Sequence, residues 1–202
     1  MNINKRAIRD SLRLMGAILF FWLYIPHLLS YVLGGGKRRL INSDLQVIQH
    51  QLHIKMPSIL QLLYHLHNNR YFRTVFYHRM GPVVDLLIGW WRPGDRYFVI
   101  SKTTKIGKGF WFAHPYARVL VANSIGDNFR CIHCTTVGHS TNKGIPTIGN
   151  NVSLGANVTI IGPVKIGNNV TVGAGTVVVK DIPDNAVVVG NPARILRYKE
   201  PK

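Results

Sequence analysis

Two histidines, His114 and His133, have the residue type and the spacing for proton transfer. They lie nineteen residues apart, and each comes two positions after a residue that we expect to be buried, Phe112 and Cys131. A neutral imidazole, with a reference pKa of about 6.5, can accept a proton from a hydroxyl group near neutral pH. The sequence therefore indicates acid–base chemistry, provided that the fold brings the two rings together.

Cys131 and Cys134 flank His133 as a C-x-x-C motif, a spacing that is also typical of zinc and redox sites. Two cysteines without a second such pair are a weak basis for a zinc site. Only Cys131 occupies a position that we expect to point inward, whereas Cys134, three residues on, should point elsewhere. We therefore expect no metal at this motif, no structural disulfide and a reducing compartment.

The elements that must position these residues repeat every six residues. Residues 148–183 can be written without a gap as IGNNVS, LGANVT, IIGPVK, IGNNVT, VGAGTV and VVKDIP, and each unit begins with an aliphatic residue. Neither an α-helix, with a period of about 3.6 residues, nor an alternating strand gives that spacing. A unit made of a short strand and a turn predicts a parallel β-helix with three units in each triangular coil.

The same frame extends towards the N-terminus and predicts an incomplete coil followed by four coils. These comprise residues 106–124, 125–147, 148–165 and 166–183. The first is nineteen residues long rather than eighteen, so it contains one inserted residue. In this register His114 and His133 occupy the same place in successive coils, which lie roughly 4.8 Å apart. We therefore expect the two imidazoles to stack on one outer ridge, with Ala156 at the same place in the third coil.

The second coil also carries a loop. Eleven steps separate Val137 from Ile148 where the frame requires six, so five extra residues within HSTNKGIP leave the coil. This loop contains His139 and Lys143, and we expect it to overhang the histidine ridge as a substrate loop, because solenoids carry binding functions on loops. The alternative is that the two histidines on a solvated ridge are incidental.

The chain begins with an apolar segment between two basic clusters. Residues 14–33 carry no formal charge, and Lys and Arg residues lie on both sides, at positions 5–13 and 37–39. A run of this length can cross a bilayer as one straight helix, but Pro26 interrupts it and basic residues on both flanks oppose translocation. Three arrangements are open: a monotopic or re-entrant helix on an anionic membrane surface, a single span, or a helix buried against the rest of the protein.

Four helices are predicted between this segment and the solenoid. A cap at 42–44 begins the first, Pro57 opens the second, the third ends near Gly81, and the fourth ends at Pro93. Five histidines in these helices lack a carboxylate or cysteine at ligand spacing, and we interpret them as structural. We divide the chain into an apolar membrane-associated segment, a helical region, the β-helix domain and a tail. Their bounds are 1–39, 40–96, 97–190 and 191–202.

The formal net charge of +17 narrows the class of partner. Through residue 105 there are 15 Lys and Arg against 4 Asp and Glu, and beyond it 10 against 4, so the excess is greatest outside the repeats. The basic residues form no array with interleaved aromatic residues, and we expect no nucleic acid. An anionic membrane surface or a phosphate-bearing substrate fits this charge.

The I-G-x-x-x-x repeats, the loop within one coil and the ending DIPDNAVVVGNPARI resemble the hexapeptide-repeat acyltransferases. FWFAHPYARVLVAN and CIHCTTVGHSTNKGIPTIGNNV are similar to the serine acetyltransferase branch, and the helical start resembles variants from capsule and exopolysaccharide loci. The resemblance implies a mainly β protein, a left-handed parallel β-helix with an N-terminal α-helical, partly membrane-associated segment. It also implies a homotrimer with acetyl-CoA as co-substrate, and we expect no metal. From the apolar start and the basic charge we expect the protein at the cytoplasmic face of the bacterial inner membrane, with the cytoplasm as the alternative.

Site residues follow from the same resemblance. It implies His114 as the general base, with His133 orienting it or binding the acceptor. The pantetheine arm of acetyl-CoA would lie along two turns of small residues, Gly155 with Ala156 and Gly173 with Ala174. The candidates for the CoA phosphates are Lys180, Arg194 and Lys199.

The chain departs from the serine acetyltransferase branch at three positions. Groups that orient the base or bind serine in that branch are replaced by Val99, Ala113 and Ile145. We therefore expect O-acetylation of a sugar hydroxyl in a capsular, exopolysaccharide or lipid-linked glycan, with L-serine as the alternative acceptor. Two other classes stay open, a metal-dependent hydratase and a non-catalytic scaffold on the same fold. The pair His133 and His139 is six residues apart, whereas the hydratase motif requires five.

Overall fold

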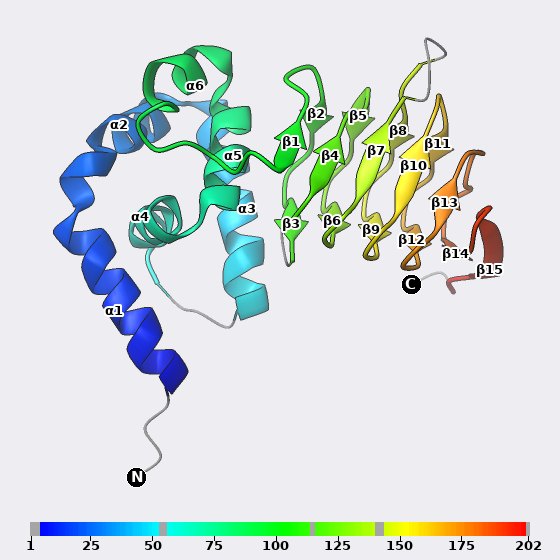
Figure 1. Cartoon of the computed structure of the whole chain (residues 1–202), viewed down its shortest axis with the longest axis horizontal. Coiled ribbons are helices and arrows are strands. Elements are labelled where there is room, and N and C mark those ends of the chain that lie inside the picture. Colours follow the sequence, from blue (N-terminus) through cyan, green and yellow to red (C-terminus); the bar gives the residue numbers. More distant parts are fainter. Residues whose placement is uncertain (1–4, 53–55, 114–115, 140–143, 201–202) are drawn as a thin grey trace.

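The computed structural model consists of a helical region stacked on one end of a β-solenoid (Figure 1). It describes residues 5–52, 56–113, 116–139 and 144–200. The helices are α1 (Lys5–Leu19), the 3₁₀ helix η1 (Phe21–Tyr24), α2 (Ile25–Leu33), α3 (Gly36–Leu52), α4 (Ser58–Asn68), α5 (Arg70–Met80) and α6 (Pro82–Ile88). The chain therefore has the predicted overall architecture, a parallel β-solenoid preceded by helices.

Three sheets form the three sides of the solenoid, and the chain visits them in turn. Side 1 contains β2 (Lys105–Ile106), β5 (Ser124–Ile125), β8 (Thr147–Ile148) and β11 (Lys165–Ile166). Side 2 contains β3 (Trp111–Phe112), β6 (Arg130–Cys131), β9 (Ser153–Leu154), β12 (Thr171–Val172), β14 (Ala186–Val189) and β15 (Arg194–Tyr198). Side 3 contains β1 (Phe98–Ile100), β4 (Arg118–Leu120), β7 (Thr136–Gly138), β10 (Thr159–Ile161) and β13 (Val177–Val178). Neighbouring strands are parallel except β15, which pairs antiparallel with β14.

The strand register confirms the six-residue frame. On side 1, Ile106 pairs with Ile125, Ile125 with Ile148, and Ile148 with Ile166. These side chains are buried. Because one aliphatic residue per strand stacks on its counterpart in the next coil, the core is a continuous apolar column that no single coil could bury alone.

The first coil departs from the frame in two places rather than one. Eight residues separate Phe112 from Leu120, whereas six separate their partners Cys131 and Val137 in the next coil. The step from Leu120 to Ile125 is then one residue short. The single inserted residue predicted from the sequence is therefore the net of two extra residues and one missing residue.

Asparagines hold the corner at which side 1 turns into side 2, which we call the asparagine corner. Asn128, Asn151, Asn169 and Asn185 have φ between 55° and 61°. Asparagine tolerates this left-handed conformation better than other residues with a Cβ atom. Their side-chain amides form a ladder, with Asn128 Nδ2 donating to Asn151 Oδ1 at 2.9 Å and Asn151 Nδ2 to Asn169 Oδ1 at 3.1 Å.

A buried ion pair attaches the helical region to the first coil. Arg79 Nε donates to Asp44 Oδ2 at 3.0 Å, and the same guanidinium also donates to the backbone carbonyls of Ile106 and Gly107. Asp44 Oδ1 accepts from the Phe110 backbone N–H at 2.8 Å. The predicted helix cap at 42–44 is wrong, since α3 begins at Gly36. The carboxylate instead serves a tertiary contact between α3, α5 and the solenoid.

The apolar segment is not one straight helix. Helix α1 ends at Leu19, η1 follows, and α2 begins at Ile25 with Pro26 in its first turn, where proline is tolerated. The break thus lies before Pro26 rather than at it. Among the described helices none is both long enough and apolar enough to span a bilayer by itself, although α1 from Ile8 together with residues 21–33 passes as a pair bent by 71°.

The last predicted helix is shorter than expected. Helix α6 ends at Ile88, and Trp90 and Trp91 follow it in a turn. Val83, Leu86 and Leu87 of this helix are exposed, whereas Val84 and Ile88 pack against the core. The second and third predicted helices are confirmed as α4 and α5. Helix α3 runs through the expected division at residue 39, and the division into domains stays a prediction.

Candidate active site

The corner between sides 2 and 3, which we call the His133 corner, brings three of the predicted residues into register. Cys131 pairs with Leu154 and Leu154 with Val172, so His133, Ala156 and Ala174, each two residues later, occupy equivalent places. Backbone hydrogen bonds connect these turns, from Asn157 N to His133 O at 3.1 Å and from Gly175 N to Ala156 O at 2.8 Å.

The predicted partner of His133 lies just outside the described residues. His114 belongs to the undescribed pair 114–115, so its stacking on His133 stays a prediction. The strand before it does have the required register, because Phe112 pairs with Cys131. Cys131 is buried and Cys134 is half-buried with φ of 54°, and both are free thiols. The prediction that only Cys131 points inward is thus confirmed.

The same corner has a ridge of small residues, which are Gly155, Ala156, Gly173 and Ala174. The two glycines are required because neighbouring atoms leave no space for a side chain. A Cβ atom on Gly155 would lie 2.6 Å from the backbone nitrogen of Ala174, and one on Gly173 would lie 2.8 Å from Val189 Cγ1. Arg194 pairs with Val189 across β14 and β15, so it lies beside this ridge and is exposed. Four small residues and one cation that the sequence suggested for acetyl-CoA therefore share one corner.

The two other predicted cations lie at different corners. Lys180 follows β13 and precedes the bridge residue Ile182, so it lies where side 3 turns back into side 1. Lys199 Nζ donates to the Asn169 carbonyl at 2.5 Å, which places Lys199 at the asparagine corner. Of the three cations predicted to bind the CoA phosphates, only Arg194 lies beside the ridge within one chain.

The loop also leaves from the corner that holds Lys180, which we call the loop corner. His139 is exposed directly after β7, and Asn123 Nδ2 donates to the Ile145 carbonyl on the other side of the loop at 3.0 Å. Lys143 lies outside the described residues. Within one chain, strand β7 separates the base of the loop from His133, so the loop starts one corner away from the ridge that it was predicted to cover.

Arg118 is a residue of the site that our sequence reasoning missed. It occupies an inward position of β4, is 0% exposed, and lies over Phe98 and Phe112 at 5.0 and 5.6 Å from the ring centroids. Its Nη2 donates to the carbonyl oxygen of Ala113 at 2.7 Å, and its Nη1 contacts Cys131 Sγ at 3.5 Å. The available signal was the count of nineteen residues, which marks an irregular coil around this position.

Burial shifts the pKa values of both Arg118 and Cys131. It lowers the pKa of the Arg118 guanidinium, which nevertheless stays charged because arginine is not deprotonated in proteins. It raises the pKa of the Cys131 thiol to about 11, with Arg118 acting in the opposite direction. Cys131 is therefore a neutral thiol near pH 7, and Arg118 is a buried cation whose Nε has no hydrogen-bond partner among the described residues.

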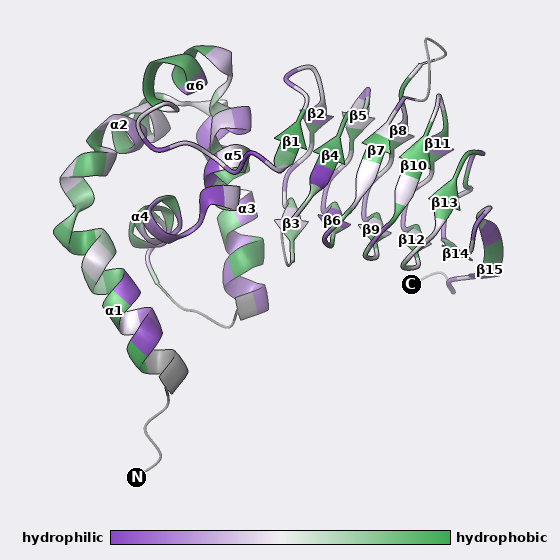
Figure 2. Cartoon of the chain, viewed as in Figure 1, coloured by the Kyte–Doolittle hydropathy of each residue, from purple (hydrophilic) through white to green (hydrophobic). Residues whose placement is uncertain are grey.

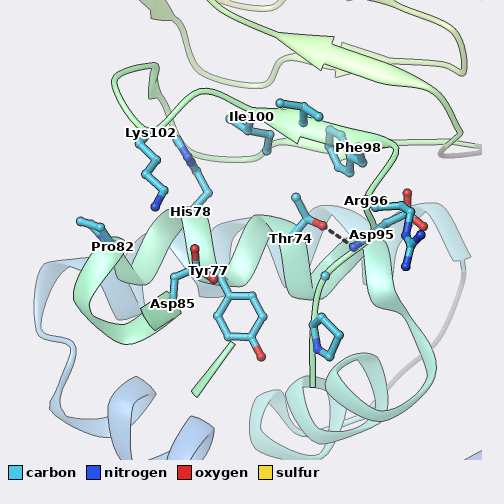
Figure 3. A pocket seen from close by; sticks show the side chains of 14 residues that line it. Thr74, Tyr77, His78, Pro82, Asp85, Asp95, Arg96, Phe98, Ile100 and Lys102 are labelled. Atoms are coloured by element: carbon cyan, nitrogen blue, oxygen red, sulfur yellow. Dashed lines mark hydrogen bonds between the residues drawn. The ribbon is translucent and has the colours of Figure 1, made fainter. Parts of the chain in front are cut away.

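A separate cavity of about 510 Å³ lies between α5, α6 and the segment around β1 (Figure 3). Tyr77, His78, Asp85 and Lys102 line it, and the Asp95 backbone N–H donates to Thr74 Oγ1 at 2.8 Å on its wall. None of the described residues that the sequence nominated for catalysis or for acetyl-CoA lines this cavity. It is distinct from the His133 corner. In the part of the chain that the structure describes, no three metal-ligating side chains form a cluster.

Comparison with known proteins identifies the repeat. Residues 145–180 match the family model described as bacterial transferase hexapeptide (six repeats). Residues 145–180 are therefore similar to the hexapeptide repeats of that family.

Proteins that are similar to this chain in sequence carry acetyltransferase names. One from Escherichia coli K12, named as a colanic acid biosynthesis acetyltransferase, WcaB, is 48% identical over 101 residues, which are 48% of this chain and 62% of the relative. Serine acetyltransferase 1 of Arabidopsis thaliana is 44% identical over 105 residues, 50% of this chain and 33% of the relative. The chain thus spans less than two thirds of the length of either relative.

Solved structures extend the likeness into the helical region. The soybean serine acetyltransferase apoenzyme superposes with a TM-score of 0.70 at 29% identity, covering 86% of this chain and 74% of that chain. A serine acetyltransferase from Neisseria gonorrhoeae gives a TM-score of 0.66 at 25% identity, over 82% and 68% of the two chains. The helices stacked on the solenoid are therefore part of the shared architecture.

Proposed function

We propose that the protein is an acetyl-CoA-dependent O-acetyltransferase whose acceptor is a sugar hydroxyl of a capsular, exopolysaccharide or lipid-linked glycan. The observation that carries this proposal is the 48% identity over 101 residues to a colanic acid biosynthesis acetyltransferase. The names of both groups of relatives support acetyl transfer, and they differ in the acceptor.

The residues around the corner favour a sugar over serine. Val99 and Ala113 stand where the serine acetyltransferase branch is expected to have carboxylates, and the Ala113 carbonyl already accepts from Arg118. An amino acid acceptor brings an ammonium group that requires an anionic partner, whereas a sugar hydroxyl does not. The described turns of this corner, at residues 132–135, 155–158 and 173–176, contain no Asp or Glu that could serve as this partner.

The proposed mechanism assigns the proton to His114. Acetyl-CoA supplies the acetyl group as a thioester, held along the ridge of Gly155, Ala156, Gly173 and Ala174. The neutral imidazole of His114 removes the acceptor proton while the hydroxyl oxygen bonds to the acetyl carbon and the carbon–sulfur bond breaks. The proton then passes to the departing thiolate. His133 orients His114 or binds the acceptor, and positioned general-base catalysis of this kind contributes roughly 10²–10⁴-fold in rate.

We further propose that the site is shared between chains in a homotrimer. One chain presents the small-residue ridge and Arg194 at one corner, but His139 and Lys180 at another. A neighbouring solenoid whose loop corner faces the His133 corner would complete the constellation. Closed cyclic symmetry gives every chain one complete site of this kind.

L-serine is the second candidate acceptor. The specific observation in its favour is the superposition on soybean serine acetyltransferase, which includes the helical region as well as the solenoid. The glycan hypothesis and the serine hypothesis share acetyl-CoA as the donor and His114 as the base. They differ only in which acceptor the site binds.

An acceptor panel tests the proposal. The full-length protein would be given acetyl-CoA with L-serine, with nucleotide sugars, or with membranes that contain lipid-linked glycan, and the release of the CoA thiol would be followed. We expect turnover with a glycan acceptor and no more than background with serine. Turnover with serine alone at ordinary concentrations would overturn the glycan acceptor, and failure to bind CoA would overturn acetyl transfer altogether.

A further inference from the structure

Three helices at one end of the molecule leave apolar faces without a protein partner. Figure 2 shows hydrophobic residues along the second half of α1, along α2 and along α6. On α1 and α2 the exposed large apolar side chains recur at helical spacing, and on α6 they are three of its seven residues. They are Ile8, Leu12, Met15, Ile18, Leu19, Ile25, Leu29, Val32, Leu33, Val83, Leu86 and Leu87. Unpartnered apolar helix faces of this size are typical of an interaction surface.

These faces are connected rather than scattered. Helices α2 and α6 are in contact although about fifty residues separate them in sequence. A groove of about 280 Å³ joins them, and its walls include Trp22 and Pro26 on one side and Leu87, Trp90 and Trp91 on the other. We call the exposed apolar side chains of α1, η1, α2 and α6, together with these tryptophans, the apolar end surface.

Tryptophans are concentrated in the apolar end surface, around the groove between α2 and α6. Trp22, Trp90 and Trp91 are exposed, which is unusual for three of the four tryptophans of a chain. Trp90 Nε1 donates to the Leu87 carbonyl at 2.9 Å. Because the polar atom of this side chain already has a partner, its exposed ring can contact an apolar partner without losing a hydrogen bond. Exposed tryptophans in an apolar surface are typical of membrane interfaces, where the amphipathic ring is stable at the headgroup level.

Basic residues border the surface on two sides. Lys37, Arg38 and Arg39 are exposed directly after α2, and Lys37 Nζ donates to the Met80 carbonyl at 2.7 Å, which fixes this cluster beside the start of α6. On α1, Arg9 and Arg13 are exposed between the apolar positions. Cations at the rim of an apolar surface match a bilayer with anionic headgroups, because each of them is attracted to the negative surface potential.

We infer that the apolar end surface, with α6 and its two tryptophans as a required part, docks on the surface of an anionic lipid bilayer. The bent pair of α1 and α2 lies in the interface, and the solenoid projects from it, because the helices cap one end of the long axis (Figure 1). The first coils, which include β3 and β6, are then nearer to the bilayer than β13. This inference does not depend on the proposed acetyl transfer, since it concerns a different surface and is measured by binding.

Vesicle flotation of the full-length protein tests the inference. The lipid is phosphatidylcholine with or without phosphatidylglycerol, and the test variant is Leu86→Ser with Trp90→Ser, two side chains that are 79% and 72% exposed. The matched control is Leu196→Ser, on β15 at the opposite end of the solenoid and 64% exposed. A second variant, Arg38→Gln with Arg39→Gln, tests the basic residues at the rim. Its control is Lys165→Gln with Arg197→Gln, which removes two cations from the solenoid. All variants are checked by thermal unfolding, and their mass is measured by light scattering.

We expect the wild-type protein to float with the anionic vesicles, and to bind less as the salt concentration rises. The α6 variant should bind at least about tenfold more weakly, since it removes two apolar anchors, and the arginine variant should lose the preference for phosphatidylglycerol. Both controls should bind like the wild type. Equal binding of the α6 variant and the wild type would overturn the inference. A lower mass of the α6 variant without any vesicle binding of the wild type would also overturn it, and would assign the surface to contacts between copies of the chain.

Discussion

Arg118 places a cation inside the solenoid at a position where other coils have uncharged residues. The strand register aligns it with Phe98, Thr135, Val158 and Thr176 on side 3. A buried cation without a carboxylate is costly, and it persists when surrounding groups over-determine its position. Two aromatic faces and the Ala113 carbonyl do so here. Because Ala113 immediately precedes His114, we interpret Arg118 as fixing the backbone that carries the proposed base.

Replacing Arg118 separates this positioning role from stability. In Arg118→Met the buried charge is removed, so the free energy of unfolding should fall by no more than about 1 kcal/mol. The rate of acetyl transfer should fall at least about tenfold, because the backbone before His114 loses its anchor. Urea unfolding and thiol release measure the two effects, with Arg130→Met, on the exterior of β6, as the control. A large loss of stability with unchanged turnover would contradict the interpretation.

Two buried histidines predict how stability depends on pH. Burial lowers the pKa of His27 and of His65 to about 4, from an ordinary value of 6.5. The unfolded chain therefore binds protons that the folded chain does not as the pH falls from about 6.5 to 4. Each histidine then costs about 1.4 kcal/mol per pH unit, so the pair makes the protein up to about 4 kcal/mol less stable at pH 5 than at pH 7.

The contribution of His65 can be isolated by replacing it. His65→Leu cannot titrate, so its stability should decline less steeply between pH 7 and pH 5 than that of the wild type. Urea denaturation at the two pH values measures the difference, and His50→Gln, at an exposed position of α3, is the control. If His65→Leu and the wild type show the same decline, burial of the neutral imidazole is not the cause.

At the scale of elements, the pair Asp44 and Arg79 makes the helices and the solenoid one unit. Its side chains are 1% and 3% exposed, and they also bind the backbone of the first coil. In Asp44→Asn the guanidinium keeps its burial and loses its counter-charge, so the free energy of unfolding should fall by about 3–5 kcal/mol. Asp10→Asn, in the exposed contact with Arg9 at 3.9 Å, should cost less than about 1 kcal/mol. Similar losses in both variants would contradict the attachment.

Elements differ in how far the sequence determines them. The solenoid could be predicted because each coil repeats one local rule, a buried aliphatic residue every six positions, and the strand register follows it. The start of α3 could not, since Asn42, Ser43 and Asp44 have the composition of a cap but Asp44 is used for a contact with Phe110, far away in sequence. The exposure of α6 could not be predicted either, because periodicity shows that a helix has an apolar face and not what covers it.

At the scale of the whole molecule, the candidate site is divided among corners. The sequence correctly grouped the small residues of the His133 corner, which follow directly from the register. It could not show that Lys180 and Lys199 lie at other corners, because their positions depend on where the solenoid turns and on how the tail pairs with β14. The repeat likewise could not predict where His114 lies relative to His133, because the first coil does not keep the six-residue frame.

Subunit complementation tests the shared site. His114→Ala and Lys180→Glu should each be nearly inactive alone, the second because it repels the CoA phosphates. If His114 and Lys180 of one site come from different chains, mixed trimers contain some intact sites. Co-expression in equal amounts should then restore roughly a quarter of wild-type turnover. No recovery above the two parents would assign the whole site to a single chain.

The central claim, that the imidazole of His114 is the general base for acetyl transfer, is tested most directly by the turnover of His114→Ala. With the best glycan acceptor and saturating acetyl-CoA, we expect release of the CoA thiol to fall by roughly 10²–10⁴-fold. Binding of CoA and the thermal unfolding temperature should stay those of the wild type, and His50→Gln should turn over normally. Turnover of His114→Ala within about threefold of the wild type would contradict the account.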